Sequence, residues 1–304
     1  MSLTAAYEGS LAADALAMPV HWYYDRPALD RDYPDLLPLQ APKPFHPDSI
    51  FWRSHYEPVN EKGDIIHDKS AWGERGIHYH RNLSAGENTM NFKLAQALYD
   101  QVRKSGRYEI EAWARQYVHL MLTPGWHDDT YIEEYHRGFF TRYAQGKPLL
   151  KCGIRDEHIG GLATVPALVA ALDQTPLEEV RPIIKSHVAL THRHSNVLRA
   201  ADCLTRLLHH LRDGTPLRQA LMEAAGDWFS TKKAEKWSRQ PDRIIIGERL
   251  SPACYIDQSF PASLYLAWKY HDDLAAAIEA NARVGGDSCH RGAVVGSLVA
   301  AQNS

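Results

Sequence analysis

Short clusters of polar residues come directly before apolar, helix-like stretches, and their side chains are of types that transfer protons or bind metals. The densest is the run His-Asp-Asp-Thr at positions 127–130, with two more carboxylates at 133 and 134. Capping a helix needs only one such side chain. Two adjacent carboxylates beside a histidine suit acid–base catalysis or a hard metal ion. We therefore predict His127, Asp128 and Asp129 as catalytic residues.

Two glycine-containing runs also precede apolar stretches. Gly-Glu-Asn-Thr occupies 86–89, and Gly-Gly-Asp-Ser-Cys-His-Arg occupies 285–291. A turn and a helix cap explain each run locally. The free amides of a helix N-terminus also attract a phosphate, and a carboxylate there binds a metal. The density of polar side chains favours this functional interpretation, with Glu87 as a further catalytic candidate.

Two further loops carry charge and glycine, at 152–161 and at 191–194, where the sequence reads Thr-His-Arg-His. Glycine lets backbone approach a ligand closely. Polar clusters that recur at helix starts are typical of an α-helical enzyme whose cleft is built from loops on one face. The residues that we predict to contact a bound ligand or cofactor are His158, Gly160, Gly161, His192, Gly285, Gly286 and Arg291.

The stretches between these clusters have helical periodicity. Met90, Leu94, Leu98 and Val102, for example, recur every four residues. Alternation typical of strands is absent, so we predict one all-α domain over 1–304. Helices are expected at 4–18, 90–102, 112–122, 130–144, 162–172, 176–190, 197–211, 216–229, 261–270, 272–284 and 288–301. The proline- and aromatic-rich segment 19–82 is expected to be an ordered insertion that borders the cleft and offers aromatic rings on which a ligand could stack.

Composition excludes some classes of protein. Lys and Arg total 34 against 37 Asp and Glu, a net charge of -3, so a broadly basic nucleic-acid surface is not expected. No apolar run approaches the roughly 18 residues of a membrane span, and the N-terminus lacks the pattern of a signal peptide. The four cysteines are about fifty residues apart without a CxxC pair, which favours reduced thiols in a cytoplasmic protein.

The ordered set of clusters resembles the ADP-ribosylglycohydrolase superfamily. The opening at 7–20, Tyr-Glu-Gly-Ser-Leu-Ala-Ala-Asp-Ala-Leu-Ala-Met-Pro-Val, is similar to the family's G-x-x-x-G-D-A-L-G-x-P-V. The run at 86–89 falls where the family has T-D-D-T, and 191–194 matches its T-H-x-H. The run at 285–290 falls where it has G-G-D-T-D-T. The resemblance extends from about residue 5 to the C-terminus.

The resemblance implies an all-α fold with a cleft for ADP-ribose-like groups and two divalent metals, usually magnesium, that activate water. This sequence departs from that pattern. Gly86, Glu87 and Asn88 replace the hydroxyl and two aspartates of the first motif, and Cys289 and His290 replace an aspartate and a threonine of the second. Two carboxylates offset only half of a +4 charge, so one ion (magnesium or manganese) or none is expected. Its candidate ligands are Glu87, Asn88, Asp287, Ser288 and His290.

The leading functional prediction is a divergent hydrolase of an N- or O-glycosidic bond in a small-molecule or protein-linked ADP-ribosyl or related nucleotide-sugar substrate, with no membrane partner. The alternative is a catalytically silent, nucleotide-sugar-binding or structural relative, since the motifs at 87–89 and 285–292 also resemble the branch of selenoprotein J and the J-crystallins. Other hypotheses are metal-free acid–base catalysis by the 127–129 cluster, which would face the same cleft, and a Cys289 nucleophile activated by His290.

Overall fold

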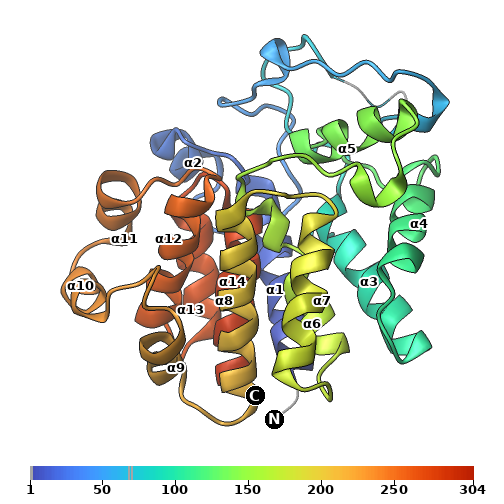
Figure 1. Cartoon of the computed structure of the whole chain (residues 1–304). Coiled ribbons are helices and arrows are strands. Elements are labelled where there is room, and N and C mark those ends of the chain that lie inside the picture. Colours follow the sequence, from blue (N-terminus) through green and yellow to red (C-terminus); the bar gives the residue numbers. More distant parts are fainter. Residues whose placement is uncertain (1–2, 68, 70) are drawn as a thin grey trace.

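The computed structural model describes residues 3–67, 69 and 71–304, and in this part of the chain all regular structure is helical apart from isolated β-bridges. Figure 1 shows a bundle of upright helices with irregular segments gathered at one end. The all-α fold predicted from the sequence is confirmed. The α-helices are α1 (Thr4–Ala17), α2 (Arg26–Asp32), α3 (Met90–Ser105), α4 (Ile110–Met121), α5 (Glu134–Ala144), α6 (Val165–Ala171), α7 (Leu177–Ala189), α8 (Ser195–Arg212), α9 (Leu217–Ala224), α10 (Thr231–Trp237), α11 (Asp242–Ile244), α12 (Ile256–Lys269), α13 (Leu274–Arg283) and α14 (Ser288–Gln302).

Helices α1 and α14 form the centre of the bundle, and the two ends of the chain lie at the same end of this pair (Figure 1). Gly9 and Gly296 face each other, and a Cβ on either would collide with the backbone of the opposite helix. Small residues thus let the two backbones touch. Because α14 is surrounded by other helices, residues Ser288–Ala301 are all buried. This central pair fixes the start of α14, where the run 285–291 lies.

The segment 19–82 is ordered where it is described and crosses the upper end of the bundle (Figure 1). It contains α2 and three short 3₁₀ turns, η1 (Met18–Val20), η2 (Phe51–Arg53) and η3 (Glu61–Gly63). Its aromatic residues make a satellite core in which Phe51 and Tyr79 pack with Tyr131 from the loop before α5. The aromatic composition of this segment therefore holds it against the loops of the bundle.

Some helix boundaries differ from the prediction. The helix expected at 130–144 begins only at Glu134, because Thr130 bonds to the backbone carbonyl of Tyr79 instead of continuing a helix. Helix α12 begins at Ile256, before Pro261, which lies inside it and leaves one backbone acceptor without its helical donor. The helix expected to reach 229 ends at Ala224. Helix α10 and the π-helical turn η6 (Ile245–Arg249) were not predicted.

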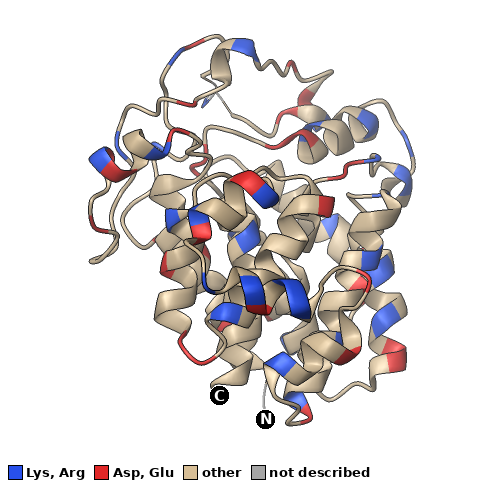
Figure 2. Cartoon of the chain, turned by 90° about the vertical axis from the view of Figure 1, so that its left-hand side faces the viewer, with Lys and Arg blue, Asp and Glu red and all other residues tan. Residues whose placement is uncertain are grey.

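Acidic and basic side chains are interspersed over the helices without a broad block of either sign (Figure 2). This distribution agrees with the small net charge of -3. None of the described helices is both long and apolar enough to cross a membrane.

Candidate functional site

A chain of buried carboxylates and imidazoles links three segments that are far apart in the sequence. Asp129 bonds to His80, whose Nε2 lies 2.8 Å from Nδ1 of His21. Nε2 of His21 lies 3.0 Å from Asp287, and the same oxygen of Asp287 lies 2.8 Å from Nδ1 of His290. All five side chains are almost fully buried. Each carboxylate faces an imidazole, and His80 and His21 bond to each other in the middle, so each buried carboxylate has a partner and protons have a path.

This chain of hydrogen-bonded side chains continues beyond His290 to residues of α3 and of the loop before α5. Nδ2 of Asn91 lies 2.6 Å from Nε2 of His290 and donates to Oε1 of Glu133 at 2.7 Å. Oδ1 of Asn91 accepts from the Tyr135 hydroxyl at 2.7 Å and lies 2.8 Å from the His136 ring. The other carboxylate oxygen of Glu133, Oε2, is buried and has no hydrogen-bond partner among the described residues. The ring of His136 lies 4.0 Å from that oxygen, so imidazoles flank the carboxylate on both sides.

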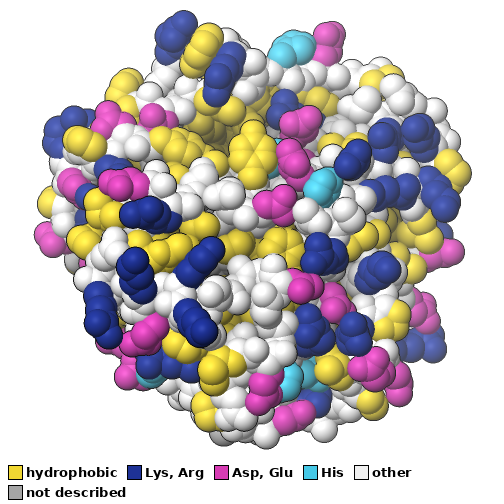
Figure 3. Space-filling view, turned by 60° about the vertical axis from the view of Figure 1, so that its left-hand side comes forward, with side chains coloured by type: hydrophobic (Ala, Val, Ile, Leu, Met, Phe, Trp, Pro, Cys, Tyr) yellow, Lys and Arg dark blue, Asp and Glu magenta, His cyan; other side chains and the backbone are white. Residues whose placement is uncertain are grey.

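A cavity of about 340 Å³ opens onto this chain. Its polar wall contains Glu133, Asp287 and His290, and its aromatic wall includes Tyr24 and Tyr255, which are 43% and 49% exposed. The space-filling view shows hydrophobic, acidic and histidine side chains meeting on one face of the molecule (Figure 3). The other lining residues are Trp22, Ile50, Arg53, Tyr79, Tyr131, Glu134, Tyr135, His158, Gly160, Ala253 and Cys254. A mostly aromatic pocket with a few convergent charges is typical of a small-molecule site.

The charges of the polar wall support one another. Burial by itself would raise the pKa of Asp287, but the charge of His290 and the hydrogen bonds from His21 and His290 lower it. Burial would likewise raise the pKa of Glu133, but the hydrogen bond and charge of His290 lower it to about 2. These two carboxylates outweigh burial and raise the pKa of His290. The cavity wall therefore holds His290 between two ionised carboxylates.

The predicted acid–base residues separate into two groups. Asp129 is buried and belongs to the chain through His80; it also accepts from the Met90 amide at 2.5 Å. Asp128 is 49% exposed and pairs with Lys69, 2.6 Å away. His127 is buried, with Nε2 3.1 Å from the Ile65 carbonyl, and its Nδ1 has no hydrogen-bond partner among the described residues. The structure thus connects Asp129, but not Asp128, to Asp287.

The residues at the start of α3 have other partners. Glu87 pairs with Lys93 and accepts from the Ser84 amide at 2.9 Å. The side chain of Asn88 donates to the Leu11 carbonyl at 2.8 Å and to the buried carboxylate of Asp14 at 3.0 Å. Both predicted ligands are therefore held by protein groups, and neither is connected by these bonds to Asp287.

The glycine loop at 158–161 lies beside the polar wall. Gly160 lines the cavity, and a Cβ there would face Tyr135 and His290. Gly161 packs against the ring of His192 so closely that a Cβ would lie 2.9 Å from it. His192 is buried, and its Nε2 lies 3.6 Å from Asp156. Gly160 and His158 thus face the cavity, whereas Gly161 and His192 support the wall from behind.

The run at 285–291 makes a turn that holds the start of α14. Gly285 and Gly286 both have positive φ, and the Gly286 amide donates to the Tyr23 carbonyl at 2.6 Å. Arg291 is fully buried and donates to the carbonyls of Asn281 and Gly285, each at 2.8 Å. Ser288 is buried, and its hydroxyl has no partner among the described residues. Arg291 therefore braces the turn that presents Asp287.

The Cys289 hypothesis is wrong. The thiol is fully buried beside the backbone carbonyl of Asp14, and burial with the nearby Asp14 carboxyl raises its pKa. A nucleophilic thiol needs a lowered pKa and access to substrate. Position 289 points into the contact between α1 and α14, which the sequence pattern at a helix N-terminus did not reveal.

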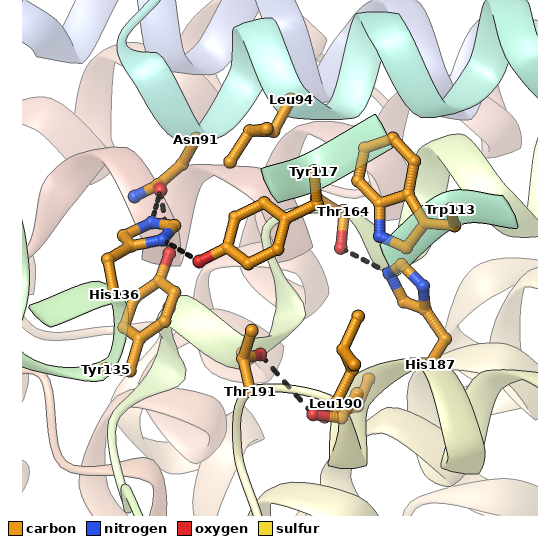
Figure 4. A pocket seen from close by; sticks show the side chains of 13 residues that line it. Asn91, Leu94, Trp113, Tyr117, Tyr135, His136, Thr164, His187, Leu190 and Thr191 are labelled. Carbon is orange, nitrogen blue, oxygen red and sulfur yellow. Dashed lines mark hydrogen bonds between the residues drawn. The ribbon is translucent and has the colours of Figure 1, made fainter. Parts of the chain in front are cut away.

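A second, smaller cavity of about 40 Å³ lies behind Tyr135 and His136. Figure 4 shows His136 between Asn91 and Tyr117, with His187 and Thr164 on the far side. The Tyr117 hydroxyl lies 2.5 Å from the His136 ring, and Thr164 lies 2.9 Å from His187. This cavity is large enough for water but not for a substrate. It is lined by Asn91, Tyr135 and His136, which also belong to the chain of hydrogen-bonded side chains.

The chain belongs to the ADP-ribosylglycohydrolase family, whose model matches residues 3–303. A solved structure described as an "ADP-ribosylglycohydrolase-related protein complex" shares the fold, with a TM-score of 0.59 and 18% identity over 98% of this chain and 86% of that one. No curated protein matches the chain significantly. Membership supports a glycohydrolase-type function and ADP-ribosylated substrates at the level of the family, which is also known for binding divalent metals.

The site residues present do not fit a pair of magnesium ions. Hard ions need several charged oxygens, but Glu87 is paired with a lysine and Asp287 with two imidazoles. In the described part of the chain, the groups whose ligand atoms lie within 4.8 Å of one another are His21–Asp287–His290 and His21–His80–Cys289. Imidazole donors suit zinc better than magnesium or manganese. The first group fits a single ion of that kind.

Sequence reasoning missed several residues of this site. His21, His80 and Asn91 lie outside the dense polar clusters, and Glu133 was noted only as part of an acidic helix start. Each has an ordinary local explanation, and only contacts over many residues in sequence bring them together. One available signal was the unusual number of histidines, 17 in all.

Proposed function

We propose that this protein hydrolyses the N- or O-glycosidic bond of an ADP-ribosyl or related nucleotide-sugar substrate. The observation that carries the proposal is the ionised carboxylate of Glu133 beside Asp287 and His290 in the wall of an aromatic cavity. Cleavage of a glycosidic bond passes through an oxocarbenium-like transition state, which a nearby carboxylate stabilises. Family membership supports this class of reaction.

Each wall of the cavity has a role in this proposal. Tyr24 and Tyr255 offer rings on which an adenine stacks. Glu133 stabilises the positive charge that develops on the ribose. His290, cationic between two carboxylates, donates a proton to the leaving group. Asp287 holds the ring of His290, and the chain to Asp129 can restore its proton.

A single divalent ion would be held by His21, Asp287 and His290, and we propose zinc rather than magnesium from the nitrogen donors. When bound, such an ion supplies a Lewis acid that polarises an oxygen of the substrate. With the ion in place, His290 is a ligand, and Glu133 is the remaining acid–base group of the wall.

The alternative, a catalytically silent or structural relative, is not favoured by the family membership. The cavity also retains charged groups that a structural protein does not need. Binding without turnover remains the measurable signature of that alternative.

The test combines binding with turnover. Protein treated with EDTA is heated with ADP-ribose alone and with manganese, zinc or magnesium, and ligand at 100 times its Kd should add about 2.7 kcal/mol of stability, a shift of a few degrees. Release of ADP-ribose from an ADP-ribosylated peptide is then followed for the wild type, Glu133→Gln and Glu111→Gln.

We expect Glu133→Gln to lower kcat roughly 10²-fold or more. Glu111 is 63% exposed on α4 and pairs with Arg115, so Glu111→Gln serves as the matched control. A thermal shift without turnover would support the silent alternative. No shift with any combination would contradict the substrate class.

A further inference from the structure

Two buried imidazoles and a buried thiol converge beneath the aromatic wall of the cavity. The possible ligand atoms of His21, His80 and Cys289 all lie within 4.8 Å of one another. We propose that these three side chains bind a zinc ion, which fastens both ends of the segment 19–82 to α14. The proposal is independent of the reaction that the protein catalyses.

The outer nitrogen of each imidazole faces a carboxylate. Nδ1 of His80 bonds to Oδ1 of Asp129, and Nε2 of His21 lies 3.0 Å from Oδ1 of Asp287. A histidine that binds a metal usually donates its other ring N–H to a carboxylate or a carbonyl, which fixes the orientation of the ring. Both rings have such a partner. The nitrogens left for an ion are therefore Nε2 of His80 and Nδ1 of His21.

These two inner nitrogens face each other. They lie 2.8 Å apart, and the two ring planes are parallel to within 1°. Without an ion, the nitrogens share one proton in a hydrogen bond. Zinc–nitrogen bonds of about 2.0 Å at tetrahedral angles place two ligand nitrogens roughly 3.3 Å apart. A separation of the rings by roughly 0.5 Å is thus enough for zinc to replace that proton.

The thiol is a donor that suits zinc. Cys289 is fully buried in the first turn of α14, and its Sγ lies 3.8 Å from the Asp14 carbonyl oxygen. Thiolate and imidazole ligands favour zinc, whereas magnesium and calcium prefer oxygen. Binding releases the proton of the thiol. The thiolate and the carboxylates of Asp129 and Asp287 then balance the charge of the ion, and water completes the tetrahedron.

The position is closed on the side of the cavity. The ring of Trp22 stacks on that of His21, with 3.7 Å between centroids, and lies 6.1 Å from that of His80. Trp22 itself lines the cavity. The two imidazoles are only 1% and 3% exposed. A substrate in the cavity does not reach the inner nitrogens, so the site is structural rather than catalytic.

The backbone beside His21 is unusual. Trp22 has a φ of +63°, in the left-handed region that bulky residues rarely adopt. Its amide donates to the Gly286 carbonyl at 2.8 Å. A conformation of this kind persists only where several contacts over-determine it. An ion on His21 supplies a further contact at this point, between the start of the segment and the turn before α14.

The three ligands come from three separate places in the chain. His21 directly follows η1 at the start of the segment 19–82, His80 lies near the end of that segment, and Cys289 is on the central helix α14 (Figure 1). His21 and His80 are 59 residues apart. A metal that closes so long a loop removes conformational freedom from the unfolded chain. The ion therefore stabilises the layer that covers the helices.

This inner position leaves the polar wall of the cavity to the substrate. An ion held by His21, Asp287 and His290 needs Nε2 of His21, the nitrogen that here faces Asp287. The inner position has a thiol and a second imidazole in place of the carboxylate, so it is the softer of the two, and we expect zinc there. His290 then stays free of metal and able to act as an acid.

Metal content tests the ligands without any substrate. Tag-free protein is purified without chelator, and its metals are measured by inductively coupled plasma mass spectrometry. We expect about one zinc ion per chain in the wild type and roughly a tenth of that or less in Cys289→Ser and in His80→Gln, since each removes a ligand. Cys203→Ser is the matched control, because this buried cysteine bonds only to the Ala224 carbonyl, and it should keep its zinc.

Cobalt distinguishes the two positions. Zinc is removed by dialysis against a chelator in mild denaturant, Co²⁺ replaces it, and the absorption spectrum is recorded. A thiolate ligand gives a sulfur-to-cobalt charge-transfer band in the near ultraviolet, which a site made of His21, Asp287 and His290 cannot give. We expect the band in the wild type and in His290→Gln, but not in Cys289→Ser.

Two results would overturn the proposal. One is cobalt bound without the band, or zinc retained in folded Cys289→Ser and lost in His290→Gln, either of which assigns the ion to Asp287. The other is a wild type that binds neither ion. Circular dichroism identifies variants that fail to fold, and the spectrum of the wild type then decides alone.

The fastening of the segment is measured by hydrogen exchange. Zinc-loaded and chelator-treated protein are compared by mass spectrometry of peptides. Peptides around His21 and His80 should exchange at least about tenfold faster without zinc, because a ligand that binds only the closed state suppresses local opening. Peptides of α7, which contacts none of the three ligands, should not change. Equal exchange in both states would contradict the fastening.

Discussion

At the level of single residues, the site is built by pairing buried charges. An isolated ionised carboxylate is very costly to bury, whereas one that is hydrogen-bonded to an imidazole is tolerated. Asp129, His80, His21 and Asp287 follow this rule, each with a neighbour of opposite character. Removing one member leaves its neighbour buried and unpaired. These hydrogen-bonded side chains therefore act as a unit, both in their effect on stability and in proton transfer.

Asp129→Asn tests that coupling. The change removes the charge that faces His80 while keeping the shape of the side chain. We expect a loss of about 3 kcal/mol of stability, typical of breaking a buried pair, together with a kcat at least tenfold lower. Chemical denaturation and peptide hydrolysis measure the two effects.

Asp227→Asn, at an aspartate that is 80% exposed, is the control and should change stability by less than about 0.5 kcal/mol. Asp128→Asn should have a smaller effect than Asp129→Asn, since its partner Lys69 lies near the surface. A larger effect of Asp128→Asn than of Asp129→Asn would contradict the placement of Asp129 among the buried, hydrogen-bonded acids and imidazoles.

At the level of helices, the site depends on how closely α1 and α14 approach. Asp287 caps α14 and His290 lies in its first turn, so their positions follow the axis of that helix. Arg291, which is buried, fixes the turn before it. The facing glycines set the distance of α14 from α1. A change far from the cavity can therefore displace its polar wall.

Gly9→Ala is predicted to destabilise the protein and to lower activity together. The new methyl group would meet the Gly296 carbonyl and Ala300, and the backbones cannot separate without disturbing the core. Overpacking of this kind costs about 1–3 kcal/mol. Gly226→Ala is the control, because a Cβ there meets nothing within 4 Å. A neutral Gly9→Ala would show that the contact is looser than described.

For the whole molecule, the buried histidines connect folding to pH. Burial lowers the pKa of His21, His136 and His187 to about 3, and those of His46 and His192 to about 4. In the unfolded chain each titrates near 6.5. Between these values the unfolded state binds protons that the folded state does not. Stability is therefore highest above pH 6.5 and falls as the pH decreases.

The predicted loss is about 1.4 kcal/mol per histidine for each pH unit below 6.5. The melting temperature should drop steeply between pH 7 and pH 5. Glu133 and Asp156 have lowered pKa values of about 2 in the folded protein. Their contribution to stability is therefore lost only below about pH 4, where the unfolded chain begins to bind protons at these groups. His158, with its pKa raised to about 11, contributes stability that is complete below pH 6.5 and is lost steadily as the pH rises from 6.5 to about 11.

The variant His187→Gln measures how much of this dependence of stability on pH comes from one buried histidine. His187 bonds to Tyr108 and Thr164, and burial is the cause of its lowered pKa. We expect the variant to be less stable at pH 7 but to lose about 1.4 kcal/mol less per pH unit on acidification. Denaturant titrations at pH 5, 6 and 7 measure both. A melting temperature that is flat between pH 5 and 7 would contradict neutral buried histidines.

The local spacing of apolar residues was sufficient to predict the long helices. The spacing of Met90, Leu94 and Leu98 predicts α3 correctly, since a helix buries one stripe and that stripe is visible in the sequence. The small residues Gly9 and Gly296 are likewise visible, and they imply close contact. The order of motifs, read as a resemblance, predicted the family that the comparisons confirm. These inferences depend on residue types and on their order along the chain, which the sequence shows directly.

The site itself required long-range packing. Hydrogen bonds join His21 to Asp287 and Asn91 to His290, pairs that are 266 and 199 residues apart. Nothing near His21 in the sequence distinguishes it from a structural histidine. The same packing turns Cys289 inward and leaves Cys254 open to the cavity, although both stand at helix N-termini. Side-chain environment is a property of the assembled helices, because burial, charge partners and access are all supplied by distant segments.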